Sequence, residues 1–279
     1  MAGRKDGKIW VDGLTTQFTG QSLSSLDLVE SERDHPTIPV LPDLWVVKIG
    51  GQSVMDRGAE AVKPIVEELV AARKAGTHLL VGTGGGTRAR HAYAIGLDLG
   101  MPTAMLARIG GSVPVQNARM IQMLTAKDGG IMCYPEDFEK LPLFLQLGTI
   151  PIMSGMPPFE FWEKAPRVGR IPANRTDAGV YLIAEFFGAK GVLYIKDEEG
   201  LYTDDPKKNP DATLIPEITA RELLESGQDD IVVERAVLEY LERSRSVKEV
   251  RILNGLKKGN VTRALNGEAI GSVIRSSKA

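Results

Sequence analysis

This chain of 279 residues has very few cysteines and histidines, and it has no large excess of either charge. Its single cysteine is Cys133, so an intrachain disulfide framework and a cysteine-rich metal site are both excluded. With 34 basic and 36 acidic residues the formal net charge is −2, which gives no reason to expect nucleic acid or an anionic membrane as the main partner. Any anion must therefore be held by local geometry.

Long hydrophobic runs are also missing. The first residues contain no apolar stretch suited to a signal peptide, and no segment reaches the roughly eighteen apolar residues of a membrane span. We therefore expect a soluble, cytoplasmic protein with no membrane partner. The hydrophobic content of 43% and the charged content of 25% are those of an ordinary globular chain, long enough to bury a full core.

The chain divides by composition into two regions. Residues 1–40 are rich in small polar residues and lack a sustained period, which indicates an N-terminal arm that is either disordered or ordered by packing on the body or on a neighbouring subunit. Residues 41–279 form the body. Its apolar patterns predict strands at 44–49, 78–82, 149–155, 191–196, 249–253 and 272–274, and helices at 56–74, 88–97, 177–187, 236–244 and 260–265.

The remaining parts of the body have weaker patterns. Segment 115–147 is predicted to be mostly helical with a break near Gly129, and 157–172 and 204–216 are predicted to be loops. Strands and helices alternate from residue 44 onward. This alternation predicts an α/β fold with a parallel sheet.

Two glycine turns follow the first two predicted strands of the body. The residues concerned are Lys48, Gly50, Gly51 and Gln52 in the first turn, and Gly84, Gly85 and Gly86 in the second. Glycines let N–H groups approach phosphate oxygens, and a lysine there can neutralise a phosphoryl group during transfer. The pattern lacks the spacing of a Walker A motif. The alternative is a plain strand-to-helix turn, and Arg88 and Arg90 are either anion contacts or surface charge.

Two further groups carry acidic residues. Asp177 follows Arg175 and Thr176, where Thr176 or Asp177 is either a helix N-cap or, for Asp177, a group at the phosphoryl-transfer locus that orients lysines or a metal ion. The second group ends the strand 191–196 and contains Lys196, Asp197, Gly200, Tyr202, Asp205 and Pro206. Such a strand end suits a nucleotide with its Mg²⁺, and the alternative is a solvated acidic turn.

Taken in order, these motifs resemble the amino acid kinase family from about Leu44 to Ile274. The resemblance implies a three-layer αβα sandwich around a mainly parallel sheet, with the acceptor bound on the N-terminal half and ATP on the C-terminal half. It also implies catalytic roles for Lys48, Asp177 and Lys196. Uridylate kinases are similar at 96–106 and 254–271, and the molybdenum storage branch is similar over the longer runs 48–58, 87–91, 154–158, 175–179 and 254–265.

The storage branch implies a hexameric cage, built from this chain alone or with a related subunit. Such a cage binds ATP and Mg²⁺ and uses ATP hydrolysis to deposit molybdate or tungstate oxo-clusters. Storage subunits can carry a histidine-rich stretch after a Pro-Pro pair, whereas residues 159–162 of this chain are Phe-Glu-Phe-Trp, and its only histidines are His35, His78 and His91. The cluster ligands then come from a partner subunit, or from other groups of this chain, or the chain stores nothing. The metal-ligating residues stay unassigned.

Three functions are compatible with these residues. The first is oxometalate storage coupled to ATP, and the second is transfer of the ATP γ-phosphate to UMP or another small acid. The third is a regulatory subunit that binds nucleotide without chemistry of its own.

Overall fold

The computed structural model describes residues 2–5, 8–11, 24–26, 36–228 and 231–277. The chain forms two units, residues 1–38 and 39–279. In the first, β1 (Ala2–Lys5) pairs with β2 (Lys8–Val11) in an antiparallel hairpin. The interpretation of residues 1–40 as an arm stays a prediction. Across the described ranges, no helix combines the length and the apolar character needed to cross a membrane.

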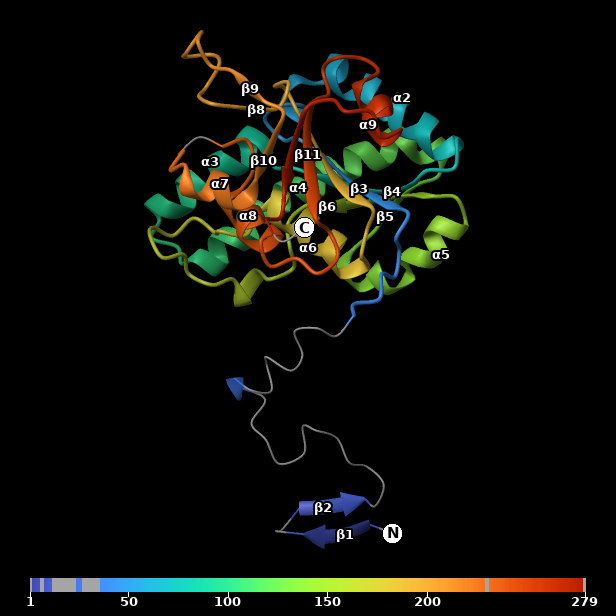
Figure 1. Ribbon diagram of the computed structural model, residues 1–279, viewed down its shortest axis with the longest axis vertical. Helices are drawn as coiled ribbons and strands as arrows, with labels where there is room; N and C mark the ends of the chain where they lie inside the picture. The colour runs from blue at the N-terminus through green and yellow to red at the C-terminus, as the bar shows by residue number, and fades with distance from the viewer. Residues whose placement is uncertain (1, 6–7, 12–23, 27–35, 229–230, 278–279) are drawn as a thin grey trace. The chain divides into compact units, whose positions relative to one another are not determined.

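The second unit is built on an eight-stranded sheet with the order β10-β12-β11-β7-β3-β4-β6-β5 (Figure 1). All neighbours in it pair in parallel except β11 and β12. The strands are β3 (Leu44–Ile49), β4 (His78–Thr83), β5 (Gly130–Met132), β6 (Ile150–Ser154), β7 (Gly191–Lys196), β10 (Glu217–Thr219), β11 (Glu249–Asn254) and β12 (Ser272–Arg275). Separately, β8 (Leu201–Tyr202) pairs with β9 (Leu214–Ile215), and the loop between them projects from the body in Figure 1.

Helices cover both faces of this sheet because the side chains of its buried strands alternate between two cores. Leu44 and Val46 of β3 pack in one core with α6, whereas Val47 and Ile49 pack in the other with α2. The helices are α2 (Ala59–Lys74), α3 (Gly86–Asp98), α4 (Thr103–Thr125), α5 (Leu141–Gln146), α6 (Thr176–Phe187), α7 (Ala220–Glu225), α8 (Arg235–Leu241) and α9 (Asn260–Leu265), with short 3₁₀ turns η1 (Met55–Arg57), η2 (Ala126–Asp128), η3 (Pro135–Lys140) and η4 (Glu160–Trp162). The α/β class and the three-layer arrangement are confirmed.

The predicted helical segment 115–147 begins too late, whereas its break near Gly129 is confirmed by β5 and its end by α5, which ends at Gln146. Helix α4 begins twelve residues earlier, at Thr103, and after it the chain forms β5 and α5. The sequence does not predict this part of the helix because it contains Gly110 and Pro114, and both residue types are unfavourable inside helices. Gly110 is required there because a Cβ at this position would lie 2.3 Å from the ring of Tyr93 on α3. The strand β10 and the helix α7 were not predicted.

Candidate functional site

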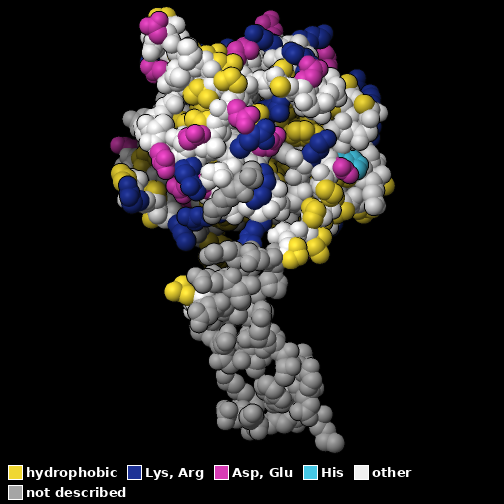
Figure 2. Space-filling view, viewed as in Figure 1, with side chains coloured by type: hydrophobic (Ala, Val, Ile, Leu, Met, Phe, Trp, Pro, Cys, Tyr) yellow, Lys and Arg dark blue, Asp and Glu magenta, His cyan; other side chains and the backbone are white. Residues whose placement is uncertain are grey.

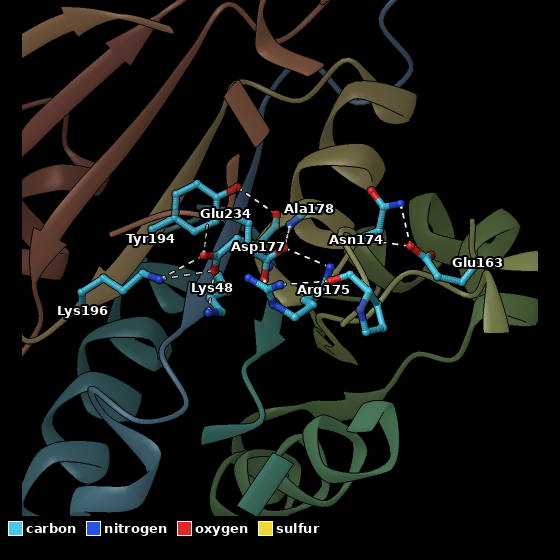
Figure 3. A network of polar contacts seen from close by, with 10 residues as sticks. Lys48, Glu163, Asn174, Arg175, Asp177, Ala178, Tyr194, Lys196 and Glu234 are labelled. Atoms are coloured by element: carbon cyan, nitrogen blue, oxygen red, sulfur yellow. Dashed lines mark hydrogen bonds and ion pairs between the residues drawn. The ribbon is translucent and has the colours of Figure 1, made fainter. Parts of the chain in front are cut away.

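Two lysines and one aspartate form a buried ion cluster at the carboxyl ends of two neighbouring strands (Figure 3). Lys48 comes from β3, Lys196 ends β7, and Asp177 lies in the first turn of α6. The Lys48 Nζ lies 2.6 Å from Asp177 Oδ1, and the Lys196 Nζ lies 3.1 Å from Asp177 Oδ2. The three side chains are 5%, 13% and 6% exposed in the order Lys48, Lys196, Asp177, so little solvent screens the cluster.

Charge and burial act in opposite directions on these groups. Burial alone would raise the pKa of Asp177, but the ammonium groups of Lys196 and Lys48 outweigh it and hold that pKa well below its ordinary value. Burial lowers the pKa of Lys196, and the neighbouring carboxylate only partly reverses this effect. At neutral pH Asp177 is therefore ionised and can hold both lysines in place.

The interpretation of Thr176 or Asp177 as a side-chain N-cap is wrong. Arg175 occupies the N-cap position of α6, and no side-chain cap comes from it. Instead Glu234 accepts the backbone N–H groups of Arg175, Asp177 and Ala178, at 3.0, 3.1 and 3.0 Å. The backbone N–H of Glu234 donates in return to Asp177 Oδ2 at 3.3 Å. The side chain of Asp177 is thus free to face the two lysines.

The two glycine turns lie against each other beside this cluster. A Cβ on Gly51 would lie 2.1 Å from the amide nitrogen of Gly86, and a Cβ on Gly84 would lie 2.6 Å from that of Gly51. Neither turn could make this contact with a larger residue. Gly86 itself has φ +71°, a left-handed conformation that favours glycine. Asn117 of α4 supports the second turn by donating its side-chain amide to the Gly84 carbonyl at 2.6 Å.

A cavity of about 840 Å³ opens over the ion cluster and the glycine turns. Most of the predicted site residues line it, namely Lys48, Gly50, Gly51, Gln52, Gly84, Gly85, Gly86, Asp177, Lys196, Asp197, Tyr202, Asp205 and Pro206. Gly200 is not among the lining residues. It packs against Ser272, whose hydroxyl would lie 2.1 Å from a Cβ at this position. Arg90 lines the cavity, whereas Arg88 turns away and donates to Gln116 and Asn117 on α4. The binding roles of these residues stay predictions.

The acidic turn after β7 is paired with cations across the mouth of the cavity. Arg57 Nη2 lies 2.7 Å from Asp197 Oδ2, and Lys207 Nζ lies 2.6 Å from Glu198 Oε1. Arg57 is 48% exposed and Lys207 63% exposed, so both can leave these carboxylates for a ligand. Figure 2 shows acidic and basic side chains interspersed on the face of the body drawn there. Among the described residues, no three His, Cys, Asp or Glu side chains are grouped to hold a metal ion.

Asp56, Arg57 and Glu234 are among the cavity residues that the reasoning from sequence missed. Asp56 and Arg57 follow the first glycine turn directly, so their position beside it was the available signal. Glu234 lies 57 residues after Asp177, and nothing local in the sequence connects the two.

Comparison with known proteins gives consistent relationships. The sequence model of the amino acid kinase family matches residues 43–254. Over 238 residues the chain is 48% identical to the molybdenum storage protein subunit beta of Azotobacter vinelandii, covering 85% of this chain and 88% of that protein. It is 28% identical to the uridylate kinase of Methanobrevibacter smithii over 239 residues, which cover 83% of this chain and 98% of that enzyme.

Solved structures show the same fold. The uridylate kinase of Archaeoglobus fulgidus aligns with a TM-score of 0.63 at 24% identity, covering 82% of this chain and 99% of that one. The UMP kinase of Bacillus anthracis aligns with a TM-score of 0.68 at 18% identity, covering 85% and 97%. At these identities the likeness concerns the fold alone.

Proposed function

Since the chain belongs to the amino acid kinase family, we propose that it is an ATP-hydrolysing subunit of a molybdenum or tungsten storage assembly. In this proposal ATP hydrolysis drives the deposition of molybdate or tungstate oxo-clusters inside an oligomeric cage, a hexamer of this chain alone or with a related subunit. The observation that carries the proposal is the 48% identity over 85% of the chain to a storage protein subunit beta. The name of that relative also supports a second kind of subunit in the cage.

The ion cluster supplies what phosphoryl transfer needs. Lys48 and Lys196 present positive charge where a terminal phosphoryl group would develop negative charge, and Asp177 fixes both of them beforehand. In hydrolysis the oxygen of water forms the new bond to the γ-phosphorus and the bond to the bridging oxygen breaks. ADP leaves, and one proton passes to solvent. In this proposal N–H groups of the glycine turns hold the phosphates, apart from those of Gly50 and Gly84, which donate to the Ile195 and Ile49 carbonyls at 3.0 Å.

The residues on the cavity wall also fit a magnesium ion that arrives with the nucleotide. When bound, Mg²⁺ neutralises charge on the β- and γ-phosphates. Asp197 and Glu198 offer the hard oxygen atoms that Mg²⁺ prefers, through water or directly. In this proposal their present partners, Arg57 and Lys207, turn to the phosphates instead.

Metal loading tests the proposal. The purified assembly is incubated with molybdate and Mg²⁺ together with either ATP or a non-hydrolysable ATP analogue, and then desalted. We expect molybdenum well above one atom per chain with ATP, and little with the analogue, by elemental mass spectrometry. Substoichiometric molybdenum in both arms would rule out storage.

Uridylate kinase activity is the second candidate, and the relatives of that name are the observation in its favour. The acceptor would be UMP or another small acid. A coupled assay with UMP and ATP measures ADP formation that depends on UMP. Turnover that requires UMP would favour this function over storage.

The alkaline side of the pH profile should depend on Lys196. Because burial lowers the pKa of Lys196 below the ordinary 10.5, its ammonium form is lost at a lower pH than that of a free lysine. We therefore expect kcat for ATP hydrolysis to fall along an alkaline limb that begins below pH 10.5. In Lys196→Arg the guanidinium stays charged, and this limb should disappear whatever the absolute rate. If the wild type and Lys196→Arg show the same alkaline limb, the titrating group is not Lys196.

A further inference from the structure

Asp56 places a carboxylate against the start of α3, inside the cavity. Its Oδ2 accepts the backbone N–H of Thr87 at 2.6 Å. A Cβ added at Gly86 would lie 2.5 Å from Asp56 Oδ1 and 2.6 Å from Oδ2, so both oxygens contact the first turn of the helix. The N-cap of α3 is Gly85, which has no side chain to cap with. The Asp56 carboxylate therefore occupies the N-terminus of α3, where an anion would otherwise be attracted into the N-terminal half of the cavity.

A protein carboxylate also takes the place of a bound anion at the N-terminus of α6. Glu234 accepts three backbone N–H groups of its first turn, and both Glu234 and Asp56 line the cavity. Arg90 and Arg175 also line the cavity, and the Nε of Arg175 already lies 3.7 Å from Glu234 Oε1. The two carboxylates thus add negative charge beside these guanidinium groups, which opposes the binding of a phosphate dianion there.

Backbone hydrogen bonds anchor the segment that carries Asp56, although the residue itself is exposed. Its backbone N–H donates to the Gly51 carbonyl at 3.0 Å, within the first glycine turn. The next residue, Arg57, donates its Nε to the Ser53 carbonyl at 2.9 Å and its Nη2 to Asp197 at 2.7 Å. An incoming phosphate would have to displace the Asp56 carboxylate or accept its repulsion at close range.

We propose that Asp56 is a specificity-determining residue that excludes phosphate-bearing acceptors from the N-terminal half of the cavity. The γ-phosphoryl group of ATP then passes to water and not to a nucleoside monophosphate. This inference rests on the proposed function, because it concerns the acceptor of the same phosphoryl group.

Titration calorimetry with UMP and with inorganic phosphate tests this assignment. The proteins are the wild type, Asp56→Asn, Asp56→Ser and Glu60→Gln, each with and without saturating ADP and Mg²⁺. Asn keeps a side-chain oxygen of the same reach, which can still accept from Thr87 N–H, while it removes the charge; Ser removes both the charge and the bulk. Glu60→Gln removes the same charge from an exposed position four residues away, outside the cavity lining.

We expect UMP to bind about tenfold or more tightly in Asp56→Ser than in the wild type, with Asp56→Asn between them and Glu60→Gln equal to the wild type. Equal UMP affinity in the wild type and in a folded Asp56→Ser, or phosphorylation of UMP by the wild type, would overturn the assignment. A wild type that neither binds ADP nor hydrolyses ATP would instead overturn the proposed function. The titrations without ADP still report on Asp56 in that case.

Discussion

Replacing Asp177 by Ala should lower the free energy of unfolding by about 3–5 kcal/mol, because two buried ammonium groups lose their shared carboxylate. Little solvent is available to take its place, since Lys48 and Lys196 are 5% and 13% exposed. Urea unfolding at pH 7, followed by far-ultraviolet circular dichroism, measures the loss. The matched control is Asp128→Ala, which removes an equally short ion pair to Lys74 at the surface, where the Lys74 side chain is 58% exposed. We expect a much smaller change in that variant.

The pH dependence of stability should distinguish this mechanism from a packing defect. The pKa of Asp177 is lowered on folding, so its contribution is present above the ordinary pKa of 3.8 and is lost as the pH falls through the folded value. Asp177→Ala should lack this acid limb.

The same variant should also differ from the wild type on the alkaline side. The Asp177 carboxylate raises the pKa of Lys196, so without it the pKa of Lys196 falls further. The folded variant then binds fewer protons than the unfolded chain as the pH approaches 10.5, and its stability should rise with pH more steeply than that of the wild type. Parallel curves for the two proteins would contradict this account.

The sheet could be predicted from sequence because its central strands are buried on both faces. A strand such as 44–49 then reads as a continuous apolar run, and the glycines that follow fix where it ends. Helices with one apolar face, such as α6, were recognisable for the same reason. In contrast, β5 has three residues and α7 six, so neither is long enough to show a period.

The candidate site could be predicted only where a local pattern carried it. Lys48 is next to the last residue of one apolar strand and Lys196 ends another, and parallel strands bring such ends to one edge of the sheet. Glu234 had no such pattern, since its place at the start of α6 depends on tertiary packing. Gly200 follows the acidic turn and is predicted for that reason, yet it packs closely against Ser272 and does not line the cavity. Sequence reasoning thus finds the residues that a strand delivers and misses those that another segment brings to a helix terminus.

Lys48→Ala should slow ATP hydrolysis more than it destabilises the fold. Removing one preorganised positive charge from the phosphoryl-transfer site raises the barrier by about 2–4 kcal/mol, which lowers kcat from about thirtyfold to nearly a thousandfold. In this variant the Asp177 carboxylate still has an ion-pair partner, because its Oδ2 lies 3.1 Å from the Lys196 Nζ. The loss of stability should therefore be smaller than in Asp177→Ala, which leaves two charges unpaired.

Single-turnover kinetics with ATP separates these two effects of Lys48, provided that each variant is shown to be folded at the assay temperature. Lys63→Ala is the control, since Lys63 is an exposed lysine on α2 outside the cavity lining and its loss should change neither rate nor stability. If kcat in folded Lys48→Ala equals that of the wild type, Lys48 serves only to hold Asp177. Within the ion cluster, the positive charge that stabilises the transition state would then come from Lys196, and the alkaline limb of the pH profile would report the electrostatic contribution of that cluster.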